Sequence, residues 1–134
     1  AVTHSIHDDP DIGSLPTAYF GASTGAAAAL RAAADPESRV FAVVSRGGRP
    51  DLAGDALPAV RAPTLLIVGG ADRVVLGLNE DAQSRLRCES RLAVVPGATH
   101  LFDEPGTLQA AAELARDWLL AKLPTPSRSG GRTT

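Results

Sequence analysis

Apolar and polar positions alternate along the chain in blocks that predict strands and helices in turn. Short apolar runs of strand length occupy residues 17–20, 40–45, 64–68 and 91–95. Each of these runs is followed by a segment with the spacing or composition of a helix, at 24–34, 52–60, 76–87 and about 108–123. Pro58 interrupts the second of these segments. Strand–helix alternation of this kind predicts an α/β fold with a parallel sheet, right-handed crossovers and helices on its faces.

The two later helices show the clearest amphipathic patterns. Val75, Leu78, Ala82 and Leu86 recur at spacings of three and four, which places them on one helical face. A longer stripe ends the pattern: Leu108, Ala111, Ala112, Ala115, Trp118, Leu119 and Leu123. We interpret Trp118 as an anchor in the core and not as a ligand platform.

The alternating pattern divides the chain into three parts. Residues 17–123 carry the strands and helices and form one domain, as expected for 134 residues. Residues 1–16 are polar and predict a flexible N-terminal segment. Residues 124–134 are rich in Pro, Ser, Gly and Arg, which is typical of a disordered tail.

Composition mainly excludes certain classes of partner, membrane insertion and an internal disulfide. Thirteen basic and fifteen acidic residues leave a net charge of −2, so the charge balance indicates neither a nucleic-acid partner nor an anionic membrane. No apolar run approaches the length of a membrane span, and residues 1–10 are too polar for a signal peptide. The expected location is therefore the cytoplasm. Cys88 is the single cysteine, which excludes an internal disulfide and predicts a packed thiol.

The first strand runs into Gly21-Ala22-Ser23-Thr24-Gly25, with a helix directly behind. Gly-x-Ser-x-Gly between a strand and a helix is the context of a nucleophile elbow, in which a strained turn exposes the serine. We expect side chains at Gly21 and at Gly25 to collide with neighbouring backbone. The alternative is a glycine-bounded turn that holds an ordinary serine.

The ends of later strands test this interpretation. In a parallel sheet, functional groups collect beyond the carboxyl ends of the strands, where Asp72 follows the third strand and His100 the fourth. Ser23 needs a base, the imidazole of His100 can accept and return its proton, and Asp72 would orient the imidazole. Taken singly, Asp72 could be a loop carboxylate paired with Arg73, and His100 an ordinary loop histidine. Three rival acids remain: Asp51, Asp55 and Asp103.

Other polar residues are weaker candidates for metal or substrate binding. His4 and His7 lie on the polar N-terminal segment without a third ligand nearby, so we expect no metal there, and we expect no cofactor. Arg46 and Arg49 follow the second strand and are candidates to hold an acidic group of a substrate. A solvated loop pair is the alternative for these arginines.

With these motifs the chain resembles the α/β-hydrolase superfamily, and most closely its dienelactone hydrolase-like branch. Three segments carry the resemblance: 21–25, 62–72 and 95–102. Residues 45–54 also resemble the hydrolase portion of bacterial proteins in which such a domain follows a phosphoribosyltransferase. The resemblance implies that Ser23 is the nucleophile, Asp72 the acid and His100 the base. It also implies that the backbone N–H of Thr24 is one oxyanion donor.

The chain departs from that branch in two ways. Dienelactone hydrolases proper use cysteine as the nucleophile, whereas this elbow holds Ser23, so their substrate is not carried over. An α/β-hydrolase also has further strands before the elbow strand, where this sequence has only residues 1–16. We therefore expect a partial fold of about four parallel strands with flanking helices, which lacks the N-terminal strands and leaves the first strand as an exposed edge.

Two functional hypotheses follow. The first is a serine hydrolase that cleaves an ester, lactone or thioester of small-molecule size through an acyl-enzyme, and that needs the N-terminal strands for full activity. The second is a truncated, non-catalytic module whose edge strand pairs with a partner, either a second copy or an N-terminal segment. A third reading makes the chain a fragment of a longer hydrolase.

Overall fold

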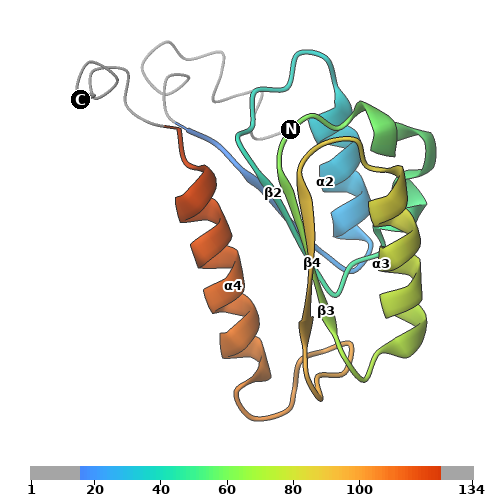
Figure 1. Ribbon diagram of the computed structural model, residues 1–134, viewed down its shortest axis with the longest axis vertical. Helices are drawn as coiled ribbons and strands as arrows, with labels where there is room; N and C mark the ends of the chain where they lie inside the picture. The colour runs from blue at the N-terminus through green and yellow to red at the C-terminus, as the bar shows by residue number, and fades with distance from the viewer. Residues whose placement is uncertain (1–15, 125–134) are drawn as a thin grey trace.

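The computed structural model describes residues 16–124 and contains one parallel sheet flanked by helices (Figure 1). The predicted flexible segment at 1–16 and disordered tail at 124–134 lie outside the described residues, apart from Pro16 and Pro124. The strands are β1 (Tyr19–Ala22), β2 (Val43–Arg46), β3 (Thr64–Gly69) and β4 (Ser90–Val95). The helices are α2 (Gly25–Ala34), the 3-10 segment η1 (Pro50–Ala59), α3 (Arg73–Arg85) and α4 (Thr107–Lys122).

The four strands pair in the order β1-β2-β3-β4, and every pair is parallel. Each strand therefore lies beside the next one along the chain, and the connection between them crosses over one face. The predicted fold class, a parallel sheet of about four strands with flanking helices, is confirmed. All carboxyl ends of the strands lie at one edge of the sheet, which is where the candidate residues follow.

Both faces of the sheet are covered by helices, and alternate residues of each strand enter different cores. In Figure 1, α4 lies on one side of the sheet, and α2 and α3 lie on the other. Val43 packs on the α2 and α3 side, whereas its neighbour Val44 packs on the α4 side. All six residues of β3 are buried, which explains its continuous apolar run. Trp118 packs in the α4-side core, as predicted, and its indole N–H donates to the carbonyl of Pro63 at 3.4 Å.

Several element boundaries differ from those predicted, including the start of β2, which lies three residues later than expected. β1 begins two residues later, at Tyr19, and continues to Ala22, so the strand ends directly at Ser23. η1 is a 3-10 segment that begins two residues earlier than the predicted short helix, and it is kinked at Gly54, which has φ 53°. α3 begins three residues earlier, since the carbonyl of Asp72 already accepts the N–H of Leu76 at 2.8 Å.

Within the described residues, β1 pairs only with β2, so it is an edge strand. Its Phe20 side chain is 55% exposed. A groove of about 590 Å³ lies between this strand and α4. Its lining is mostly apolar: Phe20, Arg46, Leu108, Ala111, Ala112, Ala115, Arg116, Leu119 and Leu120.

None of the helices within 16–124 is both long and apolar enough to cross a membrane.

Candidate active site

Ser23 stands at the tip of a tight turn between β1 and α2. Its φ of 51° lies in the left-handed region, which non-glycine residues seldom adopt. A Cβ on Gly21 would come within 2.5 Å of the carbonyl oxygen of Gly25 and 2.6 Å of the Cα of Ala26. The predicted strained turn is therefore present, and Gly21 is the residue that permits it.

The expected collision at Gly25 was wrong. A Cβ added there would meet no heavy atom within 4 Å. The reason is that Gly25 is the exposed first residue of α2, so its missing side chain would point to open space. The second glycine of the motif is not needed for packing in this structure.

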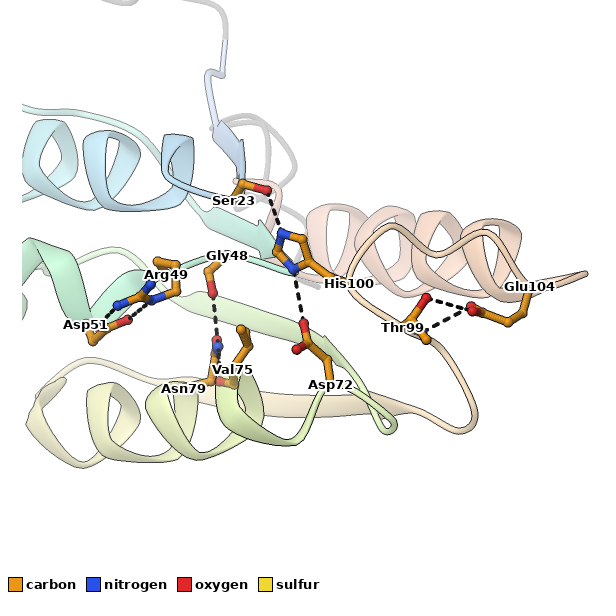
Figure 2. A network of polar contacts seen from close by, with 10 residues as sticks. All are labelled: Ser23, Gly48, Arg49, Asp51, Asp72, Val75, Asn79, Thr99, His100 and Glu104. Carbon is orange, nitrogen blue, oxygen red and sulfur yellow. Dashed lines mark hydrogen bonds and ion pairs between the residues drawn. The ribbon is translucent and has the colours of Figure 1, made fainter.

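The side chains of Ser23, His100 and Asp72 meet at the carboxyl edge of the sheet (Figure 2). The hydroxyl of Ser23 lies 3.1 Å from Nε2 of His100, and Nδ1 of His100 lies 3.0 Å from Oδ2 of Asp72. A carboxylate only accepts hydrogen bonds, so Nδ1 carries the proton and Nε2 is free to accept from the serine. The three predicted residues are thus brought together in the predicted order; their catalytic role stays a prediction.

The sheet positions the two partners of Ser23 through short loops. Asp72 directly precedes α3, and its N–H donates to the carbonyl of Gly69 at the end of β3 at 3.0 Å. The Asp72 side chain is 16% exposed and that of His100 is 41% exposed. The carboxylate is therefore largely shielded from solvent, while the imidazole remains accessible to a bound molecule.

A carboxylate stabilises the loop that carries His100. Both the N–H and the hydroxyl of Thr99 donate to Glu104, at 3.1 and 2.7 Å. These bonds, led by the one from the hydroxyl, hold the pKa of Glu104 below its ordinary value. Nothing in the sequence distinguished Glu104 from other surface acids.

The two candidate arginines take different positions. Arg46 lies in the groove beside β1, with its guanidinium 5.5 Å from the centre of the Phe102 ring. The Arg49 side chain is directed to Asp51, to which it donates two hydrogen bonds at 3.0 and 2.9 Å (Figure 2). These bonds lower the pKa of Asp51 and raise that of Arg49. It is the backbone N–H of Arg49, and not its side chain, that reaches the elbow, at 3.0 Å from the carbonyl of Ser23.

The rival acids lie elsewhere. Asp51 is engaged with Arg49, and Asp55 and Asp103 are exposed. Asp72 is the acid in contact with His100 among the described residues.

Thr24 follows Ser23 as the residue before α2, and its side chain is exposed. Its backbone N–H therefore lies at the N-terminal end of the helix, where the helix dipole favours negative charge. The oxyanion role of that N–H stays a prediction.

Cys88 is partly buried, and its Sγ lies 3.8 Å from the hydroxyl of Thr64. Burial raises the pKa of the thiol. His4 and His7 lie outside the described residues. Between residues 16 and 124, no three His, Cys, Asp or Glu side chains are grouped closely enough to hold a metal ion.

The pattern did not identify Asn79. This residue is fully buried on α3, and its side-chain amide donates to the carbonyls of Gly48 and Val75. A signal was available, because Asn79 falls four residues after Val75 and three before Ala82, on the apolar face of that helix.

Comparison with known proteins gives two kinds of match. The chain is 63% identical over 129 residues to a protein of Mycobacterium tuberculosis, found in two strains and provisionally named a phosphoribosyl transferase. The match covers 96% of this chain but only 29% of that protein, in keeping with the resemblance to the hydrolase portion of fusion proteins. No protein-family model matches the chain.

The solved structures agree with the fold. Dienelactone hydrolase from Anabaena variabilis is 55% identical with a TM-score of 0.87, over 91% of this chain and 56% of that one. A protein described as a predicted CIB-like hydrolase from Thermoplasma acidophilum is 22% identical with a TM-score of 0.63, over 87% of this chain and 56% of the other, and supports the fold alone. The chain thus spans about half the length of the structures that it matches. Over that half it has the α/β-hydrolase fold, and in sequence and structure it is similar to dienelactone hydrolase.

Proposed function

We propose that the chain is the triad-bearing part of a serine hydrolase that cleaves an ester, lactone or thioester. The observation that carries the proposal is the chain of contacts from Ser23 to His100 to Asp72, at 3.1 and 3.0 Å. A hydroxyl, an imidazole and a carboxylate in that order form a nucleophile, a base and an orienting group. The 55% identity to a dienelactone hydrolase supports a hydrolase-type reaction.

The geometry leads to a two-step reaction. Oγ of Ser23 attacks the substrate carbonyl carbon while Nε2 of His100 takes the hydroxyl proton. The tetrahedral intermediate then collapses, and His100 gives that proton to the departing alcohol or thiol. A water molecule attacks the resulting acyl-enzyme, again with His100 as base, and releases the acid and the free serine. Asp72 stabilises the imidazolium that forms in both steps.

The oxyanion that develops needs hydrogen-bond donors. Thr24 offers its backbone N–H at the start of α2, where the helix dipole adds to the stabilisation. Arg46 makes no ion pair with any carboxylate in the described part of the chain, although its guanidinium lies over the Phe102 ring, so it is a candidate to hold an acidic group on the substrate. Arg49, engaged with Asp51, is the weaker candidate for that contact.

Full activity requires, in this proposal, a further segment of a longer hydrolase. β1 offers an unpaired edge within the described residues, and the groove between β1 and α4 is lined mostly by apolar side chains. The chain covers only 56% of the dienelactone hydrolase to which it is 55% identical, so the remainder of such a protein is the occupant that fits this surface. That segment would add a strand beside β1 and supply the second oxyanion donor, whose loss costs roughly 3 to 4 kcal/mol elsewhere.

Hydrolysis of a panel of small esters, thioesters and lactones tests the proposal. The chain is assayed alone and with the remainder of the Anabaena enzyme supplied as a separate chain. We expect turnover that rises with the added segment, and a loss of at least about a thousandfold in Ser23→Ala. Ser84→Ala is the matched control, because Ser84 is an exposed serine on α3, outside the site.

Absence of turnover in both settings, or turnover that Ser23→Ala retains, would contradict the proposal. A stable dimer without turnover would instead favour the non-catalytic module that pairs through its edge strand. We place the activity in the cytoplasm, which cell fractionation would check.

A further inference from the structure

The elbow that presents Ser23 depends on a contact with the loop that follows β2. The carbonyl of Ser23 accepts two backbone hydrogen bonds, from Ala26 at 3.2 Å and from Arg49 at 3.0 Å. The first belongs to the turn itself. The second comes from residues 47–49 and ties the backbone of the strained serine to a distant part of the sequence.

That loop passes very close to the elbow. A Cβ on Gly48 would lie 2.3 Å from Oγ of Ser45, 2.4 Å from Cβ of Ala26 and 3.3 Å from the carbonyl oxygen of Ser23. Only a glycine fits there without displacing its neighbours. The peptide between Gly48 and Arg49 is therefore wedged against the turn, and a small shift of this peptide would move the serine.

Asn79 holds the other end of the same peptide. Its Nδ2 donates to the carbonyl of Gly48 at 3.1 Å and to that of Val75, one helical turn earlier, at 2.8 Å (Figure 2). Both partners are carbonyl oxygens, which fixes the orientation of the amide. The peptide of residues 48–49 thus accepts from α3 on one side and donates to Ser23 on the other.

The burial of Asn79 indicates a role other than packing. Asn79 is 0% exposed, and its Oδ1 has no hydrogen-bond partner among the described residues. A buried, half-satisfied amide is unfavourable compared with an apolar side chain of similar size on the same helical face. The helix face on either side is apolar, so an aliphatic residue would suit packing alone.

We propose that Asn79 is a positioning residue for the nucleophile. Through the peptide of residues 48–49 it keeps the carbonyl of Ser23, and with it the hydroxyl, in place opposite His100. This inference rests on the proposed function of Ser23, and it adds that two residues of the α3 segment support the site. Asp72 at the start of the helix orients the base, and Asn79 two turns later supports the nucleophile.

Two substitutions separate this role from general stability. Asn79→Ala removes both hydrogen bonds. Asn79→Ser keeps a hydroxyl that can donate to the carbonyl of Val75 within the helix but is too short for Gly48. Ala82→Gly is the matched control, since Ala82 is equally buried on the same helix and the substitution weakens the helix without touching residues 47–49.

The experiment uses the full chain and two readouts. The first is hydrogen exchange at the backbone amide of Arg49, followed by NMR, which reports the contact with Ser23 without any catalysis. The second is the rate at which a fluorophosphonate probe labels Ser23. We expect Asn79→Ser and Asn79→Ala to lose protection at Arg49 and to label about tenfold more slowly, which is the effect of one lost hydrogen bond. Ala82→Gly should lower the melting temperature about as much as the Asn79 substitutions do. It should nevertheless keep the protection of Arg49 and the labelling rate near their wild-type values.

Unchanged protection of Arg49 in Asn79→Ser, or equal losses in Ala82→Gly, would overturn the inference. Should the wild type show no labelling either alone or with the remainder of the Anabaena enzyme, the proposed function fails, yet exchange at Arg49 still decides whether Asn79 positions the elbow. If Asn79→Ala does not fold, the two readouts of Asn79→Ser alone decide whether Asn79 positions the elbow.

Discussion

Ser23 has a backbone conformation that favours glycine, and the residues around it explain how it is kept. Its φ of 51° is strained for a residue with a side chain. The turn is stabilised by hydrogen bonds from Ala26 and Arg49 to its carbonyl, and by the absence of a side chain at Gly21. Strain maintained by several independent contacts at a candidate nucleophile is consistent with a site built for exposure of that hydroxyl.

The two glycines of the motif should respond differently to a methyl group. Gly21→Ala places a Cβ within 2.5 to 2.7 Å of backbone atoms, so we expect a loss of about 1 to 3 kcal/mol in the free energy of unfolding. Gly25→Ala meets open space at the start of a helix and should be neutral or slightly stabilising. Urea unfolding of both variants measures the difference. Equal losses would show that the elbow is not packed as described.

The pair of Asp51 and Arg49 predicts a pH dependence of stability. Hydrogen bonds from Arg49 lower the pKa of the Asp51 carboxyl in the folded state, so the unfolded chain binds the proton more readily. The stabilisation is complete above the unfolded pKa of about 3.9 and is lost as the pH falls through the lower folded value. Asp51→Asn should therefore be less stable than the wild type at pH 7, with a smaller difference at pH 3.

Urea unfolding at the two pH values checks this expectation, with Asp55→Asn as the control. Asp55 is exposed in the same segment and makes no ion pair with the described residues. A difference between Asp51→Asn and the wild type that persists unchanged at pH 3 would contradict the role given to the pair.

At the scale of elements, the loop after β4 decides where His100 lies. Glu104 accepts from the N–H and hydroxyl of Thr99, directly before the histidine, and so closes the loop. Glu104→Gln keeps one accepting oxygen but loses the charge and one of these bonds. We expect ester hydrolysis to slow by about tenfold with little change in melting temperature. Asp103→Asn, at an exposed neighbour, should leave the rate unchanged, and a similar loss there would argue against a specific role for Glu104.

The existence and order of the elements could be predicted from the sequence, because buried parallel strands require apolar runs and amphipathic helices require a stripe. The boundaries could not be placed as well. The start of α3 depends on the carbonyl of Asp72, and the kink in η1 depends on the positive φ of Gly54. Both are backbone features that hydrophobic spacing does not encode.

The same limit applies to the site. Ser23, Asp72 and His100 could be placed together because parallel strands bring their carboxyl ends to one edge. Asn79 could be recognised only as a polar residue on an apolar helix face, because its contact with Gly48 depends on how α3 packs against the loop after β2. The role of Glu104 depends on the fold of its own loop, which brings it to Thr99. Gly25 was misjudged for a related reason: the motif suggests a clash that only the local geometry can test.

At the scale of the whole molecule, β1 is an edge strand of the described sheet, and it adjoins the groove beside α4. Phe20 on that edge is 55% exposed and lines the groove with α4. If the remainder of a longer hydrolase covers this surface, Phe20→Asp should weaken its association and lower the activity of the mixture by at least about tenfold. The stability of the chain alone should change by only about 0.5 kcal/mol.

Val94→Asp is the matched control for that substitution. Val94 is 45% exposed on β4, the opposite edge strand of the described sheet. Sedimentation of the chain with the remainder of the Anabaena enzyme, supplied separately, measures the association. Equal effects of the two substitutions would exclude the groove as the docking surface. If the chain alone self-associates and Phe20→Asp abolishes this, the occupant of the groove is a second copy of the chain.

The measurement that tests the central claim most directly is to locate a fluorophosphonate on the chain by peptide mass spectrometry. We predict one modified residue, Ser23, with labelling that is lost in Ser23→Ala and strongly slowed in His100→Ala, since the imidazole accepts the serine proton. Labelling should be faster when the remainder of a longer hydrolase is present. Absence of label on Ser23 in both settings, or a rate that His100→Ala leaves unchanged, would contradict the account.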